Sequence, residues 1–233
     1  MGTFNEVLNS PYLLLFLLVF VFQGSLWLKN RIGSPLINPT LITTVVIIVY
    51  LTVSATPYQS FEDASRFVTF WLQPAVVCLA VPLYVQWQKI KSQWFAIISS
   101  QVVGSIVGVV SGVWLVQMLG GSEAAALSVA AKSVTTPIAI EVTKSVGGVI
   151  GINAGTVLIA GVAGQMIGLA FFVWTRLKSP MAQGIAMGTA CHALGIASIM
   201  PLGQRYVAYG TVGLIVNGVL TAFFAPIIVP WLV

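Results

Sequence analysis

Long apolar stretches follow one another along almost the whole chain, separated by short groups of glycine, proline, amide or charged residues. A helix that crosses the hydrocarbon core of a bilayer needs roughly 20 apolar residues, and lipid does not tolerate unpaired backbone groups. The pattern therefore predicts an all-α polytopic membrane protein with about seven or eight hydrophobic segments. These segments span approximately residues 12–28, 36–54, 65–87, 93–119, 124–146, 149–174, 181–200 and 206–232.

Composition supports a single transmembrane domain over residues 1–233. Hydrophobic residues make up 58% of the chain and charged residues 6%, whereas a soluble domain carries about a quarter charged residues. The net charge of +5 is too small and too scattered to indicate a nucleic-acid partner. The first apolar stretch lacks the basic start and small-residue cleavage site of a secretory signal, and no transit segment precedes it. We therefore expect a multi-pass protein of a bacterial inner (cytoplasmic) membrane.

Two of the apolar stretches are interrupted by proline, at Gln73-Pro74 and at Pro137. A proline removes one helical N–H and frees a carbonyl one turn earlier. The pattern predicts two interrupted or re-entrant helices, and an inverted repeat over about 36–119 and 124–232. The alternative is that glycine and proline are simply common in membrane helices. Each interruption is followed by small residues at every fourth position, which let helices approach closely: Gly104, Gly108 and Gly112, then Ala160, Gly164 and Gly168.

Short basic clusters mark the ends of three apolar stretches, as in loops that face the cytoplasm. The third cluster lies in the cytoplasm only if segment 124–146 enters and leaves on one side, as a re-entrant hairpin. An inverted repeat would favour equal behaviour of both interrupted segments, so the pattern leaves the number of crossings open. The clusters are Lys29 with Arg31, Lys89 with Lys91, and Arg176 with Lys178.

The segment Lys132-Ser133-Val134-Thr135-Thr136-Pro137 is the strongest candidate for a binding site. Pro137 suits the first position of a helix and Thr136 its N-cap, and the free N–H groups of such a helix attract anions. Lys132 adds a positive charge, and a lysine at a helix break within a membrane is costly unless it has a use. The alternative is a proline kink whose hydroxyls bond to the backbone while Lys132 reaches an interface.

Other polar residues in apolar stretches are weaker candidates. Gln73 and Pro74 are the counterpart of this segment in the first interruption, although Gln73 also suits an interfacial position. His192, the only histidine, is either a proton carrier or a neutral hydrogen-bonding residue between helices. Glu141 and Lys144 are three residues apart and can pair on one helix face. The chain contains no CxxC, HExxH, Walker or dinucleotide motif, so we expect no metal, no cofactor and no enzymatic activity.

Three motifs, KSVTTPIA, QPAVVCLAVPLY and GTACHALG, resemble the LrgB/CidB family of bacterial membrane proteins from about residue 10 to the C-terminus. The family is similar to the plant plastidial glycolate/glycerate translocator, and bacterial members are linked to pyruvate uptake. The resemblance implies a short 2-hydroxy- or 2-keto-monocarboxylate as substrate. It assigns substrate-binding roles to Lys132, Ser133, Thr135, Thr136, Pro137, Pro74 and His192.

Two functions therefore compete. The first is a secondary transporter of a small organic anion (glycolate, glycerate or pyruvate) by alternating access, with a homo-oligomer (dimer) expected. The second is a holin- or antiholin-like protein that regulates murein hydrolase export or cell lysis, with a small LrgA/CidA-like membrane protein as partner. The interruption at Lys132–Pro137 favours the transporter, because a scaffold needs no polar group at mid-membrane.

Overall fold

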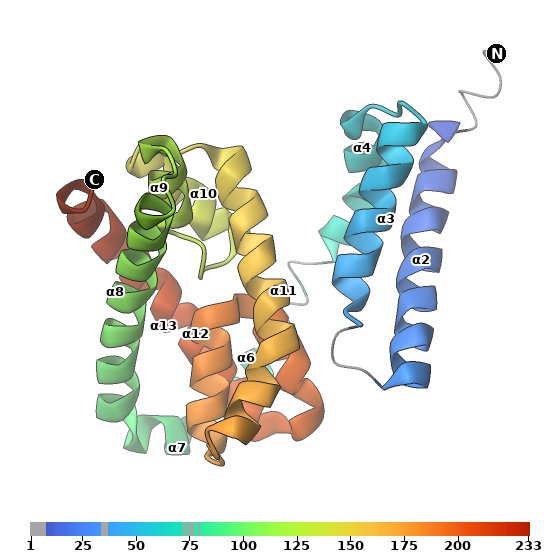
Figure 1. Cartoon of the computed structure of the whole chain (residues 1–233). Helices are drawn as coiled ribbons and strands as arrows, with labels where there is room; N and C mark the ends of the chain where they lie inside the picture. Colours follow the sequence, from blue (N-terminus) through green and yellow to red (C-terminus); the bar gives the residue numbers. More distant parts are fainter. Residues whose placement is uncertain (1–7, 34–36, 72–73, 75–76, 79) are drawn as a thin grey trace. The chain divides into compact units, whose positions relative to one another are not determined.

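The computed structural model describes residues 8–33, 37–71, 74, 77, 78 and 80–233. Within these residues the chain is helical and contains no strand, which confirms the predicted all-α membrane fold (Figure 1). The helices form two compact units, Met1–Cys78 and Leu79–Val233. Five helices of the described residues are long and apolar enough to cross a membrane, and Pro39–Val53 is a shorter apolar helix.

In the first unit the structure describes the helices α2 (Pro11–Ile32), α3 (Pro39–Val53) and α4 (Tyr58–Phe70). Helix α2 ends at Gly33, whose positive φ of 68° allows its N–H to bond to the Lys29 carbonyl. Helix α3 begins where the Asn38 side chain accepts a hydrogen bond from the Leu41 N–H. Both α3 and α4 pack against α2.

The second unit contains the longest helices, and its core is built where they cross. One cluster of buried residues joins Val109 of α8 and Ala225 of α13 to Ala131 and Val134 of the turn between α9 and α10. The elements are α6 (Ala80–Val85), α7 (Trp87–Ser92), α8 (Trp94–Met118), α9 (Glu123–Val129), α10 (Thr136–Ser145), α11 (Ile150–Trp174), α12 (Pro180–Ile199), η1 (Met200–Leu202), α13 (Gln204–Ile228) and η2 (Val229–Trp231).

Helices α9 and α10 form a re-entrant hairpin, which we call hairpin 1 (residues 123–145). The chain leaves the helical conformation between them, after Val129, and the predicted break before Pro137 is confirmed. The last turn of α9 lies beside the start of α11, because Ser128 accepts hydrogen bonds from the Val149 N–H at 2.7 Å and from Asn153 at 2.9 Å. Hairpin 1 thus begins and ends at the same end of the unit (Figure 1).

Helix α12 forms a second hairpin, hairpin 2 (residues 180–199), that the sequence pattern does not predict. His192 has φ 45° and ψ −136°, outside the helical region, and a Cβ at Gly195 would overlap the carbonyl of Met187. Before this bend α12 runs in the same direction as α13: Gly184 packs on Tyr206, and Thr189 bonds Asn217. Since η1 and one glycine join the two helices, the second half of α12 must return toward its start.

The two hairpins enter the unit from opposite ends, hairpin 1 beside the end of α8 and hairpin 2 beside the end of α11 (Figure 1). Glycines on the preceding helix make room for each hairpin. Gly112 of α8 lies against Lys132 and Val129 of hairpin 1, and Gly164 of α11 lies against Cys191 of hairpin 2. The predicted small residues at every fourth position therefore seat the hairpins.

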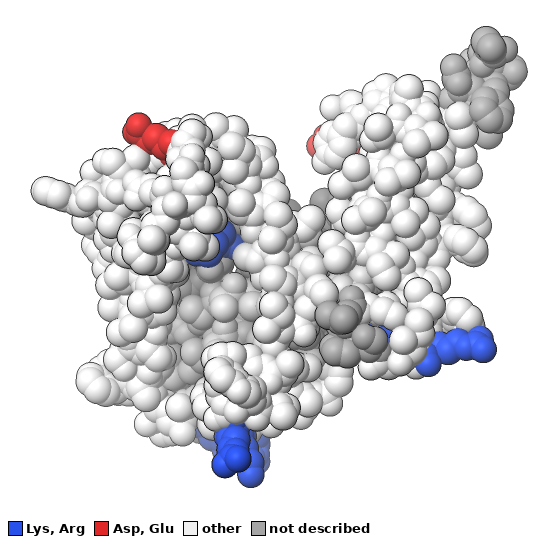
Figure 2. All heavy atoms as spheres, in the orientation of Figure 1, with Lys and Arg blue, Asp and Glu red and all other residues white. Residues whose placement is uncertain are grey.

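Hairpin 1 also accounts for the charge distribution of the second unit. Because hairpin 1 returns to the side from which it enters, the first residues of α8 and the last residues of α11 lie at the same end of the unit. In agreement, Ala96 near the start of α8 and Met181 just after α11 line one cavity. Lys89, Lys91, Arg176 and Lys178 flank these helix ends, and Figure 2 shows basic atoms at this edge of the unit and acidic atoms at the opposite edge.

This arrangement predicts that Lys89 and Arg176 face the same compartment, the cytoplasm by the charge rule. Single cysteines at positions 89 and 176, with Glu123→Cys as the opposite-side control, are labelled in intact cells with a membrane-impermeant maleimide. We expect labelling at 123 alone. Labelling at 176 but not at 89 would mean that segment 123–145 crosses the membrane once.

Candidate functional site

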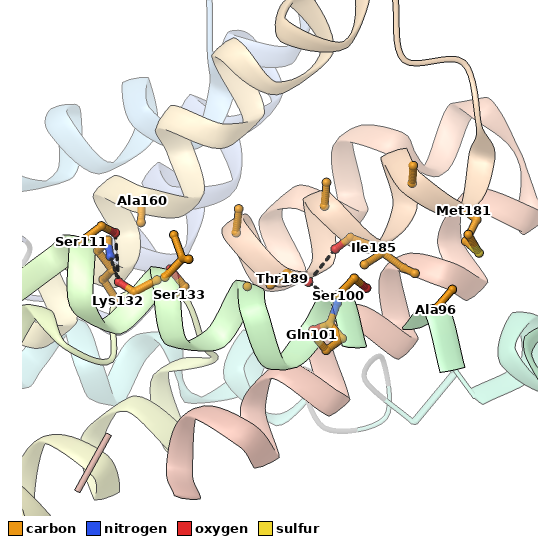
Figure 3. A pocket seen from close by; sticks show the side chains of 16 residues that line it. Ala96, Ser100, Gln101, Ser111, Lys132, Ser133, Ala160, Met181, Ile185 and Thr189 are labelled. Atoms are coloured by element: carbon orange, nitrogen blue, oxygen red, sulfur yellow. Dashed lines mark hydrogen bonds between the residues drawn. The ribbon is translucent and has the colours of Figure 1, made fainter. Parts of the chain in front are cut away.

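A cavity of about 630 Å³ lies between α8 and the first half of α12, and the tip of hairpin 1 closes one end of it (Figure 3). Small and apolar residues form most of its wall. Six polar residues interrupt this surface: Ser100, Gln101, Ser111, Lys132, Ser133 and Thr189.

Lys132 lies at the end of the cavity formed by hairpin 1. Its Nζ donates to the Gly108 carbonyl at 2.6 Å. At a rise of 1.5 Å per residue, Gly108 is about 21 Å from the start of α8 and about 15 Å from its end. Lys132 therefore lies near the middle of a bilayer whose hydrocarbon core is about 30 Å thick. Figure 2 shows basic atoms recessed in a hollow of this unit.

The ammonium group of Lys132 has no acidic partner among the described residues. The ion pairs found there are Arg66 with Asp63 at 3.1 Å and Lys144 with Glu141 at 2.8 Å. An ammonium group has three donors, and one of them is used by Gly108. A half-buried cation of this kind is costly without an anion, so this end of the cavity suits a negatively charged group.

Two hydroxyls accompany Lys132. Ser111 donates to the same Gly108 carbonyl at 3.4 Å, and Ser133 lines the cavity beside Lys132 (Figure 3). Gly112 leaves room for the ammonium group in this position, because a Cβ there would lie 2.7 Å from the Lys132 Nζ.

A second polar group, formed by Gln101 and Thr189, lies further along the cavity (Figure 3). Gln101 donates through Nε2 to the Thr189 hydroxyl at 2.6 Å, and that hydroxyl donates to the Ile185 carbonyl at 2.7 Å. The Gln101 side chain is fully buried, and its Oε1 has no hydrogen-bond partner. These two hydrogen bonds fix the orientation of the Gln101 amide. Its oxygen is left as a buried acceptor without a partner.

The structure corrects the expected start of α10. The N-cap is Thr135, whose carbonyl accepts the Ala139 N–H at 2.9 Å, so Thr136 and Pro137 are the first and second helical residues. Thr135 makes no side-chain capping bond. Helix ends are uncertain by one residue from sequence. Thr136 and Pro137 are exposed, and neither they nor Thr135 line the cavity.

His192 does not line the cavity either. His192 is buried at the bend of hairpin 2, where its Nε2 is 3.1 Å from the Val157 carbonyl of α11. Pro74 belongs to the first unit, and Gln73 lies outside the described residues. That the breaks near Pro74 and Pro137 face each other stays a prediction. Of the predicted residues, the structure brings Lys132 and Ser133 together in the cavity.

Gln101, Thr189 and Ser111 were not predicted from the sequence. Gln101 and Ser111 belong to none of the three motifs. Thr189 belongs to GTACHALG, but the resemblance assigns the binding role in that motif to His192. A buried amide in a membrane segment is itself a signal of function, and it would have selected Gln101. Together with Lys132 and Ser133 these residues provide one positive charge, several hydroxyls and apolar walls, a set that suits a small monoanion.

Comparison with known proteins places the chain in a family. The model of the LrgB-like family matches residues 18–231. The chain belongs to the LrgB family. The uncharacterized protein YxaC of Bacillus subtilis (strain 168) is 34% identical over 220 residues, which cover 94% of this chain and 95% of YxaC.

Two further relatives carry the name antiholin-like protein LrgB. The protein from Bacillus mycoides (strain KBAB4) is 33% identical and the one from Bacillus cereus (strain B4264) 32% identical. Each match spans 209 residues, 90% of this chain and 91% of the relative. No solved structure matches the chain.

Proposed function

We propose that this LrgB-family protein is a secondary carrier of small monocarboxylates such as glycolate, glycerate or pyruvate. The observation that carries the proposal is the Lys132 ammonium group, which lies at mid-membrane depth on the wall of a cavity and has no acidic partner among the described residues. A carboxylate bound there would supply the missing negative charge. The single cation matches one carboxylate rather than two.

The arrangement of the two hairpins supports movement of the anion and not only its binding. Carriers place substrates at mid-membrane, between discontinuous helices that enter from opposite sides. The cavity extends from Ala96 and Met181, at the basic end, to Lys132. A monocarboxylate would enter from that end, and access from the other side would require hairpin 1 to move. We place the protein in the bacterial inner (cytoplasmic) membrane as a dimer.

The names of the relatives favour a second function, antiholin-like control of murein hydrolase export or cell lysis. Such a protein would act through assembly with a small LrgA/CidA-like membrane protein, and it would need no ligand. The two functions differ in one measurable property. A carrier binds its substrate as a purified chain, whereas a regulator depends on its partner.

Ligand binding by the purified chain tests the proposal. Thermal unfolding in detergent is followed with glycolate, glycerate or pyruvate, and with the matching alcohols ethylene glycol and glycerol as uncharged controls. At a ligand concentration of 100 Kd the stabilisation amounts to about 2.7 kcal/mol, which is readily measured. We expect the carboxylates to raise the melting temperature and the alcohols to leave it unchanged. Equal melting temperatures in all solutions would favour the regulatory function.

Ser133 and Thr136 provide a matched pair of hydroxyl substitutions within hairpin 1. Ser133 lines the cavity beside Lys132, whereas Thr136 is exposed outside it. A hydrogen bond to a charged group contributes about 1.5–3 kcal/mol. Ser133→Ala should therefore weaken carboxylate affinity by about tenfold to a hundredfold, and Thr136→Val should leave it unchanged. Titration calorimetry measures both affinities. A loss of affinity in Thr136→Val but not in Ser133→Ala would place the anion at the start of α10 instead.

A further inference from the structure

Asn217 of α13 lies where the tips of both hairpins meet. The side chain is 1% exposed, and its Nδ2 donates to the Ser133 carbonyl of hairpin 1 at 3.0 Å and to the Thr189 carbonyl of hairpin 2 at 3.1 Å. Its Oδ1 accepts from Ser105 of α8 at 2.8 Å and from Thr221 at 3.4 Å. One amide thus joins both hairpins to two long helices.

Both carbonyls need this donor because the hairpins leave them without a helical partner. In a continuous helix the Ser133 carbonyl would pair with the N–H of residue 137, but Pro137 has no N–H. The Thr189 carbonyl would pair with the N–H of Ala193, which follows the bend at His192. An unpaired carbonyl is costly within a membrane. The Asn217 side chain supplies the hydrogen-bond donor that each of the two carbonyls lacks.

We propose that Asn217 is a positioning residue that holds the two hairpin tips together in the conformation seen here, and that its two donated hydrogen bonds break when the carrier changes access. This inference rests on the proposed carrier function. Ser133 and Thr189 both line the cavity (Figure 3). The amide therefore fixes the distance between the part of the site beside Lys132 and the part beside Gln101.

The test measures the separation of the hairpin tips. Spin labels are attached at Thr136→Cys and Ala193→Cys, two exposed positions beyond the tips, in the full-length chain with Cys78→Ser and Cys191→Ala. Dipolar spectroscopy in lipid nanodiscs then gives the distance distribution. Asn217→Leu keeps the size of the side chain but removes both donors, and Ser105→Ala is the matched control, because it removes one bond to the same amide and leaves both donors in place.

We expect one distance between the spin labels in the parent and in Ser105→Ala. In Asn217→Leu a second, longer distance should appear beside the first, and a cooperative melting transition should show that this variant is folded. The ratio of the two populations should shift by at least tenfold. If Asn217→Leu does not fold, Asn217→Asp replaces it, because a carboxylate still accepts from Ser105 and Thr221. A folded variant with the parent's single distance overturns the inference, and so does failure of both variants to fold, since Asn217 would then be purely structural.

No substrate is present in this measurement, so its result is independent of the transport assay. If the parent transports carboxylates but the hairpin tips stay together in the Asn217 variants, the carrier function stands and the positioning role of Asn217 falls. A chain that moves no carboxylate but shows the second distance would lose the proposed function and keep the role of Asn217 in joining the hairpins.

Discussion

The Gly188→Ala substitution is expected to destabilise the second unit by about 3 kcal/mol, the upper end of the usual cost of overpacking, because it overpacks a contact between two backbones. Gly188 of hairpin 2 packs against Gly210 of α13, and a Cβ at position 188 would overlap the Gly210 carbonyl group. A flexible side chain could move away, but here α12 and α13 would have to separate. Their separation would also lengthen the bond between Asn217 and Thr189. The melting temperature of the purified variant in detergent measures the effect.

Gly155→Ala is the matched control for this prediction. Gly155 lies within α11, and a Cβ there would meet no described heavy atom within 4 Å apart from its chain neighbours and the backbone of its own helix. Since alanine favours a helix over glycine by about 0.5–1 kcal/mol, the variant should be as stable as the parent or slightly more so. Equal melting temperatures for Gly188→Ala and the parent would contradict the close packing of hairpin 2 on α13.

Lys132→Gln is expected to lower carboxylate affinity by a hundredfold or more while the chain stays folded. The variant removes the charge but keeps a donor group near the Gly108 carbonyl. Two opposite charges at 4 Å attract by about 4 kcal/mol at the effective dielectric constant found near protein surfaces. The charge should therefore contribute more to binding than any one hydroxyl of the site. Titration calorimetry gives the affinity, and thermal unfolding without ligand gives the stability.

Lys144→Gln is the control for Lys132→Gln, because it makes the same substitution in the same hairpin. Lys144 is exposed and paired with Glu141, and surface ion pairs contribute about 0–1 kcal/mol. The carboxylate affinity and the stability of the Lys144→Gln variant should match those of the parent. If Lys132→Gln instead unfolds and Lys144→Gln does not, the ammonium group serves the structure through Gly108 rather than a ligand.

Much of the fold was predictable, because the apolar stretches follow directly from the thickness of the bilayer. The positive-inside rule also favours the re-entrant path of segment 124–146, because this path puts Lys89 and Arg176 on one side, although the repeat pattern leaves the number of crossings open. Hairpin 2 was not predictable. Residues 181–200 contain no internal proline and have the length of a single crossing. The bend at His192 depends on packing against glycines of α11 and α13, which are distant in sequence.

The candidate site was predictable only in part, for a related reason. Lys132 and Ser133 stood out because a charge and a hydroxyl beside a proline break are costly in a membrane. The same pattern selected Thr136 and Pro137, but sequence proximity does not tell which side chains of a turn point into a cavity. Gln101 and Asn217 come from other helices, and only the folded chain brings them to the hairpins.

Counterflow in proteoliposomes tests the central claim most directly. Vesicles containing the purified full-length chain are loaded with unlabelled glycolate and diluted into a trace of labelled glycolate, with Lys132→Gln vesicles as the control. The carrier function predicts transient accumulation of label in the parent vesicles and none in the Lys132→Gln vesicles. No exchange of glycolate, glycerate or pyruvate by the parent, with or without a small LrgA/CidA-like protein, would contradict it.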